Sequence, residues 1–143
     1  MPCDFGILLT EALVPHIHQT DDLAVIAAEI ASLPKQNKFR PRIVIITHGA
    51  DPTIVVSSDA PTSPKIYPII PVATADIVDT NGAGDSFAGG FLGALVLGKS
   101  LDEAIEGGHR LGAMCIRQVC AHGRSLAFPL TYNFADWRSA QMA

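Results

Sequence analysis

Hydrophobic periodicity first predicts a helix in the N-terminal third of the chain. Its apolar residues recur at positions i, i+3, i+4 and i+7, which is the spacing of one helical face: Leu23, Ile26, Ala27 and Ile30. Either Asp21 or Asp22 can cap the start of this helix, and Pro34 ends it.

Two strands are predicted directly after this helix. Residues 42–47 are a run of β-branched residues, typical of a strand that is buried on both faces of a sheet. Residues 48–52 form a turn, and residues 53–57 predict the next strand, so we expect two antiparallel neighbours. The segment 58–71 holds four prolines, which confine any strand there to a sheet edge or an irregular path. A short apolar run at 5–9 is a further candidate strand.

Two more helices are predicted in the second half of the chain. One runs from about Asp85 to Leu97, with Gly98 as its C-terminal cap. The next opens on a capping box formed by Ser100 and Glu103, and it continues to about residue 116. The periodicity is lost after Val119, and residues 131–143 are expected to be a loosely held tail. Helices and strands in this order predict a layered α/β fold with a mostly parallel sheet and flanking helices.

Composition limits the class of protein. The 143 residues amount to one domain at most, and 48% apolar against 17% charged residues is enough to build a core. A net charge of -4 gives no basic footprint for nucleic acid. The longest apolar stretch, residues 87–98, is too short to span a bilayer, and the N-terminus lacks the basic region of a secretory signal. We therefore expect a soluble cytoplasmic protein, with the nucleus as an alternative location.

The three cysteines agree with that location. They are odd in number and lack metal-type spacing, which fits a reducing compartment better than a disulfide framework: Cys3, Cys115 and Cys120.

A glycine motif carries the clearest chemical signal in the chain. Residues 79–92 read Asp-Thr-Asn-Gly-Ala-Gly-Asp-Ser-Phe-Ala-Gly-Gly-Phe-Leu, and they join the end of an apolar run to the start of a helix. The backbone N–H groups of Gly82, Ala83 and Gly84 can gather around an anion there, where the helix dipole also favours negative charge. Asp85 follows at once, and a carboxylate beside an anion site can act as general base for a hydroxyl that attacks a phosphate.

Two better-known phosphate motifs do not account for these residues. Residues 93–100 satisfy the P-loop pattern in letters, but their interior is Ala-Leu-Val-Leu, which favours a helix over a phosphate-binding loop. The dinucleotide fingerprint needs a third glycine at position 87, which is Phe87 here.

Four histidines and one glutamate are weaker candidates. His16 and His18 have no nearby cysteine partners, so a zinc site there is disfavoured. His48 lies in a turn directly after a strand, where α/β proteins often bind ligands. His109 lies among glycines, which either allow close helix packing or clear space for a flat ligand such as a purine. Glu11 is a metal-site residue or a surface charge, and the sequence alone favours the surface charge.

Residues 79–92 closely resemble the C-terminal signature of the ribokinase-like (PfkB) carbohydrate kinases. The asparagine that precedes Gly-Ala-Gly-Asp, Asn81, resembles the adenosine kinase branch of the family more than the sugar kinase branch. Residues 33–49 resemble the approach to the nucleotide strand in that branch, and residues 108–114 resemble its late helix. The resemblance covers roughly residues 21 to 119, and three matches in the same order are specific.

The resemblance implies transfer of the ATP γ-phosphate to the 5'-hydroxyl of adenosine, with Mg2+ as cofactor. It implies Asp85 as catalytic base and an anion hole made by the amides of residues 82–84. Asn81 matches a position close to the nucleoside and phosphate, and Glu11 is the one residue that can correspond to the magnesium motif. Two further groups match the ATP side, namely the turn of Thr47, His48 and Gly49, and His109 near the adenine.

The resemblance also implies missing parts. Members of the family are more than twice this long, and their lid and nucleoside pocket come largely from an N-terminal half. Residues 1–20 diverge, and residues 21–130 correspond to the C-terminal, ATP-side part of the kinase domain. Three interpretations follow. The first is an adenosine kinase of which this chain is the C-terminal, ATP-side portion. The second is a truncated remnant that at most binds nucleotide, or that needs the N-terminal half or a partner chain to complete its site, and the third is a sugar kinase of the same family.

Overall fold

The computed structural model describes residues 8–10 and 21–118. The order along the chain is β1 (Leu8–Thr10), α1 (Leu23–Ser32), β2 (Ile43–His48), β3 (Asp51–Ser57), β4 (Ala60–Tyr67), the 3-10 turn η2 (Thr74–Asp76), α2 (Ala83–Val96) and α3 (Leu101–Cys115). The three helices and the strands β2 and β3 form close to where the sequence predicts them, whereas η2 was not predicted. Residues 5–7 of the first candidate strand, Glu11, His16, His18 and the tail 131–143 lie outside the described residues.

The strands form one sheet in the order β1-β2-β3-β4. β1 pairs with β2 in parallel, with Leu8 opposite Ile45, whereas β2–β3 and β3–β4 pair antiparallel. The layered α/β class is thus confirmed, but a mostly parallel sheet is wrong for the described strands. The reason lies in the connections: two-residue turns join β2 to β3 and β3 to β4, which permit only antiparallel pairing, while the long connection through α1 permits a parallel pair. β4 forms an edge of the described sheet, as its prolines predict.

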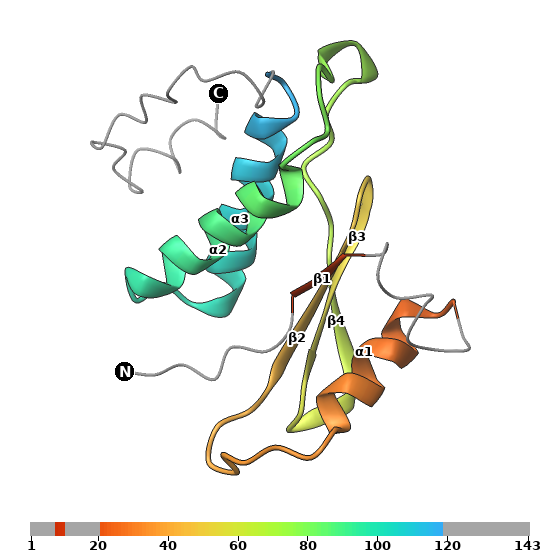
Figure 1. The fold of residues 1–143 in the computed structure, drawn as a ribbon, viewed down its shortest axis with the longest axis vertical. Coiled ribbons are helices and arrows are strands. Elements are labelled where there is room, and N and C mark those ends of the chain that lie inside the picture. The colour runs from red at the N-terminus through yellow and green to blue at the C-terminus, as the bar shows by residue number, and fades with distance from the viewer. Residues whose placement is uncertain (1–7, 11–20, 119–143) are drawn as a thin grey trace.

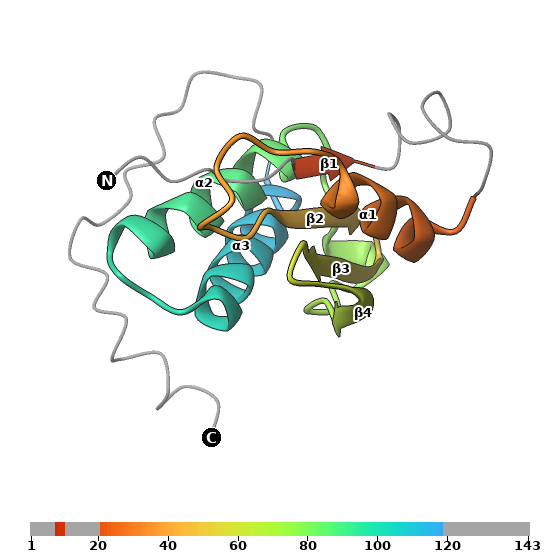
Figure 2. The same cartoon turned by 90° about the horizontal axis from the view of Figure 1, so that it is seen from below.

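Helices cover both faces of the sheet. Figure 1 shows α1 on one side and the α2–α3 pair on the other, and the perpendicular view in Figure 2 agrees. Successive side chains of a strand point to opposite faces, so β2 and β3 each supply two cores. The first core joins α1 to Val44, Ile46 and Val56. The second joins Ile45 and Val55 to apolar residues of α2 and α3.

Small residues let α2 and α3 approach each other closely. A Cβ added at Gly90 would lie 2.5 Å from the carbonyl oxygen of Gly107, and one added at Gly108 would lie 2.7 Å from the ring of Phe87. The close-packing interpretation of the glycines near His109 therefore holds for Gly107 and Gly108, both of which are buried.

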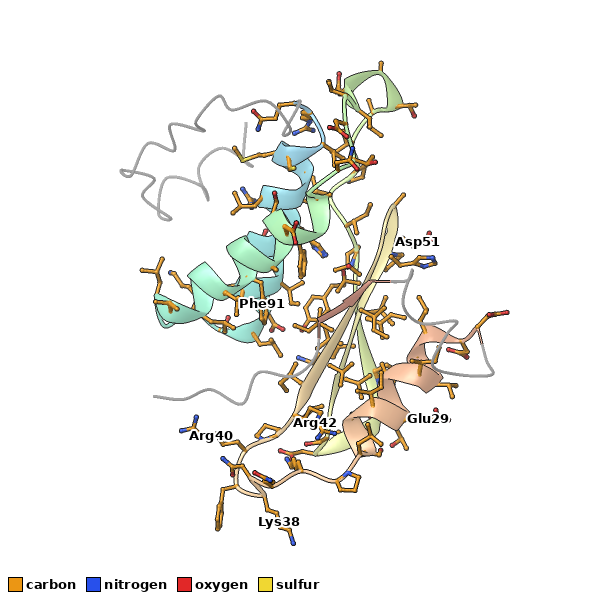
Figure 3. The ribbon with its side chains drawn as sticks, in the orientation of Figure 1. Glu29, Lys38, Arg40, Arg42, Asp51 and Phe91 are labelled. Atoms are coloured by element: carbon orange, nitrogen blue, oxygen red, sulfur yellow. The ribbon has the colours of Figure 1, made fainter. Side chains whose placement is uncertain are left out.

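Polar side chains fix the ends of the helices. Asp22 caps α1 by accepting hydrogen bonds from the amides of the next turn, and the predicted capping box of Ser100 and Glu103 opens α3. The guanidinium of Arg42 lies by the C-terminal end of α1 (Figure 3), where it donates to the carbonyls of Ile30, Leu33 and Pro34 at 2.7 to 3.1 Å. β4 is joined to the start of α3 because Asp102 accepts a hydrogen bond from Tyr67 and faces Lys65.

Residues 93–100, which satisfy the P-loop pattern in letters, do not form a phosphate-binding loop. Residues 93–96 belong to α2, and Gly98 ends that helix with a φ of 76°. Within the part of the chain that the structure describes, no helix is both long and apolar enough to cross a bilayer.

Candidate active site

A cavity of about 310 Å³ lies where the β2–β3 turn, the start of α2 and the second half of α3 meet. Its walls are largely apolar, with a few polar groups, and its volume is at the lower end of the range for small-molecule sites. The residues that line it come from the end of β2 and the turn (Thr47, His48, Gly49), from β3 (Thr53), from the segment after β4 (Ile69, Ile70, Val72), from α2 (Ala83, Gly84, Phe87) and from α3 (His109, Gly112, Ala113, Ile116).

The glycine motif forms the turn that starts α2. Gly82 is the N-cap residue with a φ of 77°, a left-handed conformation that glycine adopts without strain, and its carbonyl accepts from Ser86 N–H at 2.9 Å. The amide of Ala83 donates to the Thr80 carbonyl at 3.3 Å. Among the described residues, the amides of Gly84 and Asp85 have no protein acceptor, as is general in the first turn of a helix. The start of α2 therefore offers N–H groups, and the positive end of a helix dipole, beside the cavity.

The C-terminal end of α3 holds this turn in place. The carbonyl of Ile116 accepts from the amides of Val78 and Asp79 at 2.8 and 3.2 Å. The thiol of Cys115, which is buried, donates to the carbonyl of Asn81 at 3.5 Å. The Asn81 amide in turn donates to Asp79 Oδ1 at 2.9 Å. Four hydrogen bonds thus set the path of the chain into the glycine motif.

The β2–β3 turn supplies the opposite wall. His48 Nδ1 lies 3.4 Å from Asp51 Oδ2, which ties the two sides of the turn together, and Figure 3 shows Asp51 at the tip of this hairpin. Gly49 has a φ of 53°, so a glycine suits the left-handed conformation that the turn requires. Thr47 lies on the same face of β2 as Ile45, two residues earlier, and so points toward the α2–α3 layer.

His109 stands between the sheet and α2. Its Nε2 is 2.8 Å from Thr53 Oγ1, and its ring is tilted against the ring of Phe87 at a centroid distance of 5.4 Å. Burial lowers the pKa of the imidazole from its ordinary value, because a half-buried ring is less able to carry charge. The ring is therefore neutral near pH 7.

The structure brings most of the sequence-predicted site residues together. Ala83, Gly84 and His109 share the cavity with the turn at 47–49. Asn81, Gly82 and Asp85 do not line it; they are exposed and occupy the turn and first helical residues next to it. Gly112 lines the cavity where α3 passes the start of α2, and a Cβ there would lie 3.5 Å from the Ala83 carbonyl oxygen, an ordinary van der Waals contact.

Sequence reasoning missed several residues of the cavity. Thr53 is predicted only as part of a strand, and Phe87 only as part of the glycine motif and its helix. Ile69 and Ile70 fall in the proline-rich segment 58–71, and Val72 follows it. Thr53 had a usable signal: it lies two residues before Val55 and so on the same face of β3, where a hydroxyl is unusual among buried residues. The contribution of residues 69–72 depends on how the chain returns past the turn, which local pattern does not specify.

No group of three or more His, Cys, Asp or Glu side chains converges as a metal site within residues 8–10 and 21–118. Asp79, the carboxylate closest in sequence to the glycine turn besides Asp85, is already an acceptor for the Asn81 amide. Glu11, which the resemblance matches to the magnesium motif, lies outside the described residues.

Comparison with known proteins decides the family. Residues 11–124 match the model of the pfkB family carbohydrate kinases. The chain belongs to this family. It is 52% identical over 98 residues to an adenosine kinase of Schizophyllum commune, a match that covers 68% of this chain and 28% of that protein. It is 44% identical over 114 residues to an adenosine kinase of Schizosaccharomyces pombe, covering 80% of this chain and 32% of that protein.

A solved relative confirms the fold of this family member. The crystal structure of Anopheles gambiae adenosine kinase, in complex with a di(adenosine) tetraphosphate, superimposes with a TM-score of 0.74 at 34% identity. The match covers 82% of this chain and 35% of that one. The chain thus spans about a third of the length of the relatives it matches.

Proposed function

We propose that this chain provides the ATP-side, catalytic-loop portion of an adenosine kinase, which transfers the γ-phosphate of ATP to the 5'-hydroxyl of adenosine to give AMP. The observation that carries the proposal is the start of α2, where the amides of Gly84 and Asp85 have no described protein acceptor and adjoin the cavity. Such a helix start stabilises the charge that develops on a phosphoryl group in transfer.

The catalytic roles in this proposal are those that the resemblance implies, and the positions of the residues support them. The amides of residues 82–84 face the transferred phosphoryl group, with Gly84 the best placed because Ala83 already donates to Thr80. Asp85, exposed in the first turn of α2, accepts the proton of the attacking hydroxyl as general base. Asn81 lies close to the nucleoside and the phosphate. Thr47, His48 and Gly49 form the turn on the ATP side, and His109 lies near the adenine; these four residues line the cavity.

Adenosine and ATP are the small-molecule substrates of this proposal. Mg2+ enters with the ATP phosphates, a common arrangement because magnesium retains waters and needs few protein carboxylates. The Anopheles gambiae enzyme gives support through its ligand, which joins two adenosine groups by phosphates and so resembles a nucleoside and a nucleotide held together. Identities of 44–52% to adenosine kinases favour adenosine over a sugar as acceptor.

A second function is favoured by the length of the matches. Because the chain spans about a third of its relatives, it is alternatively a remnant that binds nucleotide without catalysis, or a part that needs an N-terminal half or a partner chain. A site with one wall missing retains its anion-binding amides but loses the positioning of the acceptor, which supplies a large part of the rate.

Replacement of the proposed base tests the assignment. The 143-residue chain, and a chimera in which it replaces the matching segment of the Schizophyllum commune enzyme, are assayed for ATP-dependent conversion of adenosine to AMP. In whichever form is active, Asp85→Asn should lower kcat by about a hundredfold or more, because a general base is lost. Asp76→Asn in the 3-10 turn, another exposed carboxylate, is the matched control and should leave kcat unchanged.

The two proteins also separate the alternatives. Activity of the isolated chain excludes the remnant, and activity of the chimera alone shows that the missing half is required. A chimera that is fully active with Asn at position 85 contradicts the role of Asp85. Phosphorylation of ribose in preference to adenosine contradicts the choice of acceptor.

A further inference from the structure

Thr53 is the one buried polar or charged residue among those the structure describes, with 1% of its surface exposed. It lies on β3 with Val55, on the face toward α2 and α3, and it lines the cavity. Its side-chain oxygen is 2.8 Å from His109 Nε2. A buried hydroxyl costs free energy unless its hydrogen bonds are made, so this contact decides how the group is satisfied.

Counting donors and acceptors indicates which atom carries the proton. A threonine hydroxyl has one O–H to donate, and a neutral imidazole has one N–H and one bare nitrogen. If Nε2–H donated to Thr53, the Thr53 O–H would need a second acceptor, and no other is present within the described residues. If the hydroxyl donates to Nε2, its only donor is satisfied by that one bond. The ring proton of His109 then resides on Nδ1.

The ring has little freedom to change this arrangement. Phe87 packs against it at 5.4 Å, and the buried Gly108 brings the α3 backbone within contact of Phe87. Burial also lowers the pKa of His109, so one nitrogen is bare near neutral pH. Nε2 is engaged by Thr53, so Nδ1 is the ring nitrogen that has no partner among the described residues, and the His109 side chain lines the cavity.

We propose that Thr53 is a positioning residue that holds His109 as the Nδ1–H tautomer, so that the imidazole presents a hydrogen-bond donor to an acceptor ring nitrogen of a bound purine. This inference deepens the proposed function and rests on it for the ligand, whereas the tautomer itself does not depend on any ligand. The Nδ1–H donor of His109 favours a ligand that places an acceptor nitrogen opposite it, and it disfavours a ligand that places a hydrogen-bond donor there.

The test combines NMR with nucleotide binding on the full chain. Long-range proton–nitrogen spectra at pH 7.5 report which ring nitrogen is protonated, and His109→Gln assigns the signals. The wild type and Thr53→Ser should show Nδ1–H, whereas Thr53→Val should show Nε2–H or a mixture. Calorimetry with ATP should show binding weakened about tenfold by Thr53→Val, the effect of one lost hydrogen bond, and changed less than about twofold by Thr53→Ser. Thr62→Val, on the exposed side of β4, is the matched control.

Each outcome bears on the inference. An Nε2–H ring in the wild type overturns it, and this measurement does not require the valine variant to fold. Thr53→Val that unfolds at lower temperature but binds ATP as well as the wild type shows a purely structural Thr53 and also overturns it. If the wild type shows Nδ1–H but binds no ATP, the proposed function and the purine contact are both overturned, while the role of Thr53 in fixing the tautomer stands.

Discussion

A half-buried imidazole links the stability of this protein to proton binding. The pKa of His109 is lowered in the folded state by burial, while the unfolded chain has the ordinary value of about 6.5. The unfolded state therefore binds the proton more readily. The stabilising contribution is complete above about pH 6.5 and is lost as the pH falls through the folded-state pKa.

Thermal unfolding across pH should reveal this linkage. We expect the melting temperature of the wild type to fall between pH 7.5 and 5 by more than that of His109→Gln, because glutamine cannot titrate. The comparison removes contributions from the other histidines, which both proteins share. Parallel curves for the two proteins would show that His109 is not the group responsible.

Single residues differ in how far the sequence determines them. Ser100, Glu103 and Gly98 were predictable because caps depend on neighbours a few positions away. The cavity positions of Ala83, Gly84 and His109 were consistent with the resemblance, whereas the exposure of Asp85 beside that cavity required the structure. The pairing of Thr53 with His109 joins residues 56 positions apart, and no local pattern contains that contact.

At the scale of elements, the α2–α3 pair determines the shape of the site, because α2 supplies the anion-binding end and α3 supplies both His109 and the Ile116 carbonyl. Their separation is set by Gly90, where an added Cβ would lie 2.5 Å from a backbone oxygen of Gly107 that cannot move aside easily. Phe91, the next residue on α2, is buried toward the sheet (Figure 3), so α2 cannot rotate freely to relieve a clash.

Gly90→Ala and Gly89→Ala form a matched pair that tests this packing. A Cβ at Gly89 meets nothing within 4 Å, so alanine should stabilise the helix by about 0.5–1 kcal/mol through its better helix propensity. Gly90→Ala should instead lower the free energy of unfolding by on the order of 1–3 kcal/mol, as overpacking does. Urea denaturation measures both. Equal stabilisation by the two substitutions would mean that the helices are not in close contact there.

Elements were predicted better than their arrangement. The helices and the paired strands β2 and β3 follow from periodicity, as does the edge position of β4 from its prolines. The direction of pairing depends on connection length, and the mostly parallel sheet was wrong because the two-residue turns on both sides of β3 permit only antiparallel pairing.

At the scale of the whole molecule, β2 and β3 form the middle of a three-layer arrangement. Val44, Ile46 and Val56 belong to the α1 core, and Ile45 and Val55 belong to the α2–α3 core. The sequence predicted this double burial of residues 42–47 from their unbroken apolar run. It could not indicate which helices cover which face, because that follows from the handedness of connections rather than from composition.

Sharing two strands between both cores has a consequence for how the molecule opens. If α1 detached, or if α2 and α3 detached, one face of β2 and β3 would expose its apolar side chains, and the same two strands support the remaining layer. The two cores should therefore behave as one cooperative unit. In native-state hydrogen exchange, the amides shared by β2 and β3 should exchange only through global unfolding, whereas those on the outer side of β4 exchange earlier through local fluctuation. Distinct exchange free energies for the most protected amides of α1 and for those of α2 and α3 would instead show that the layers open separately.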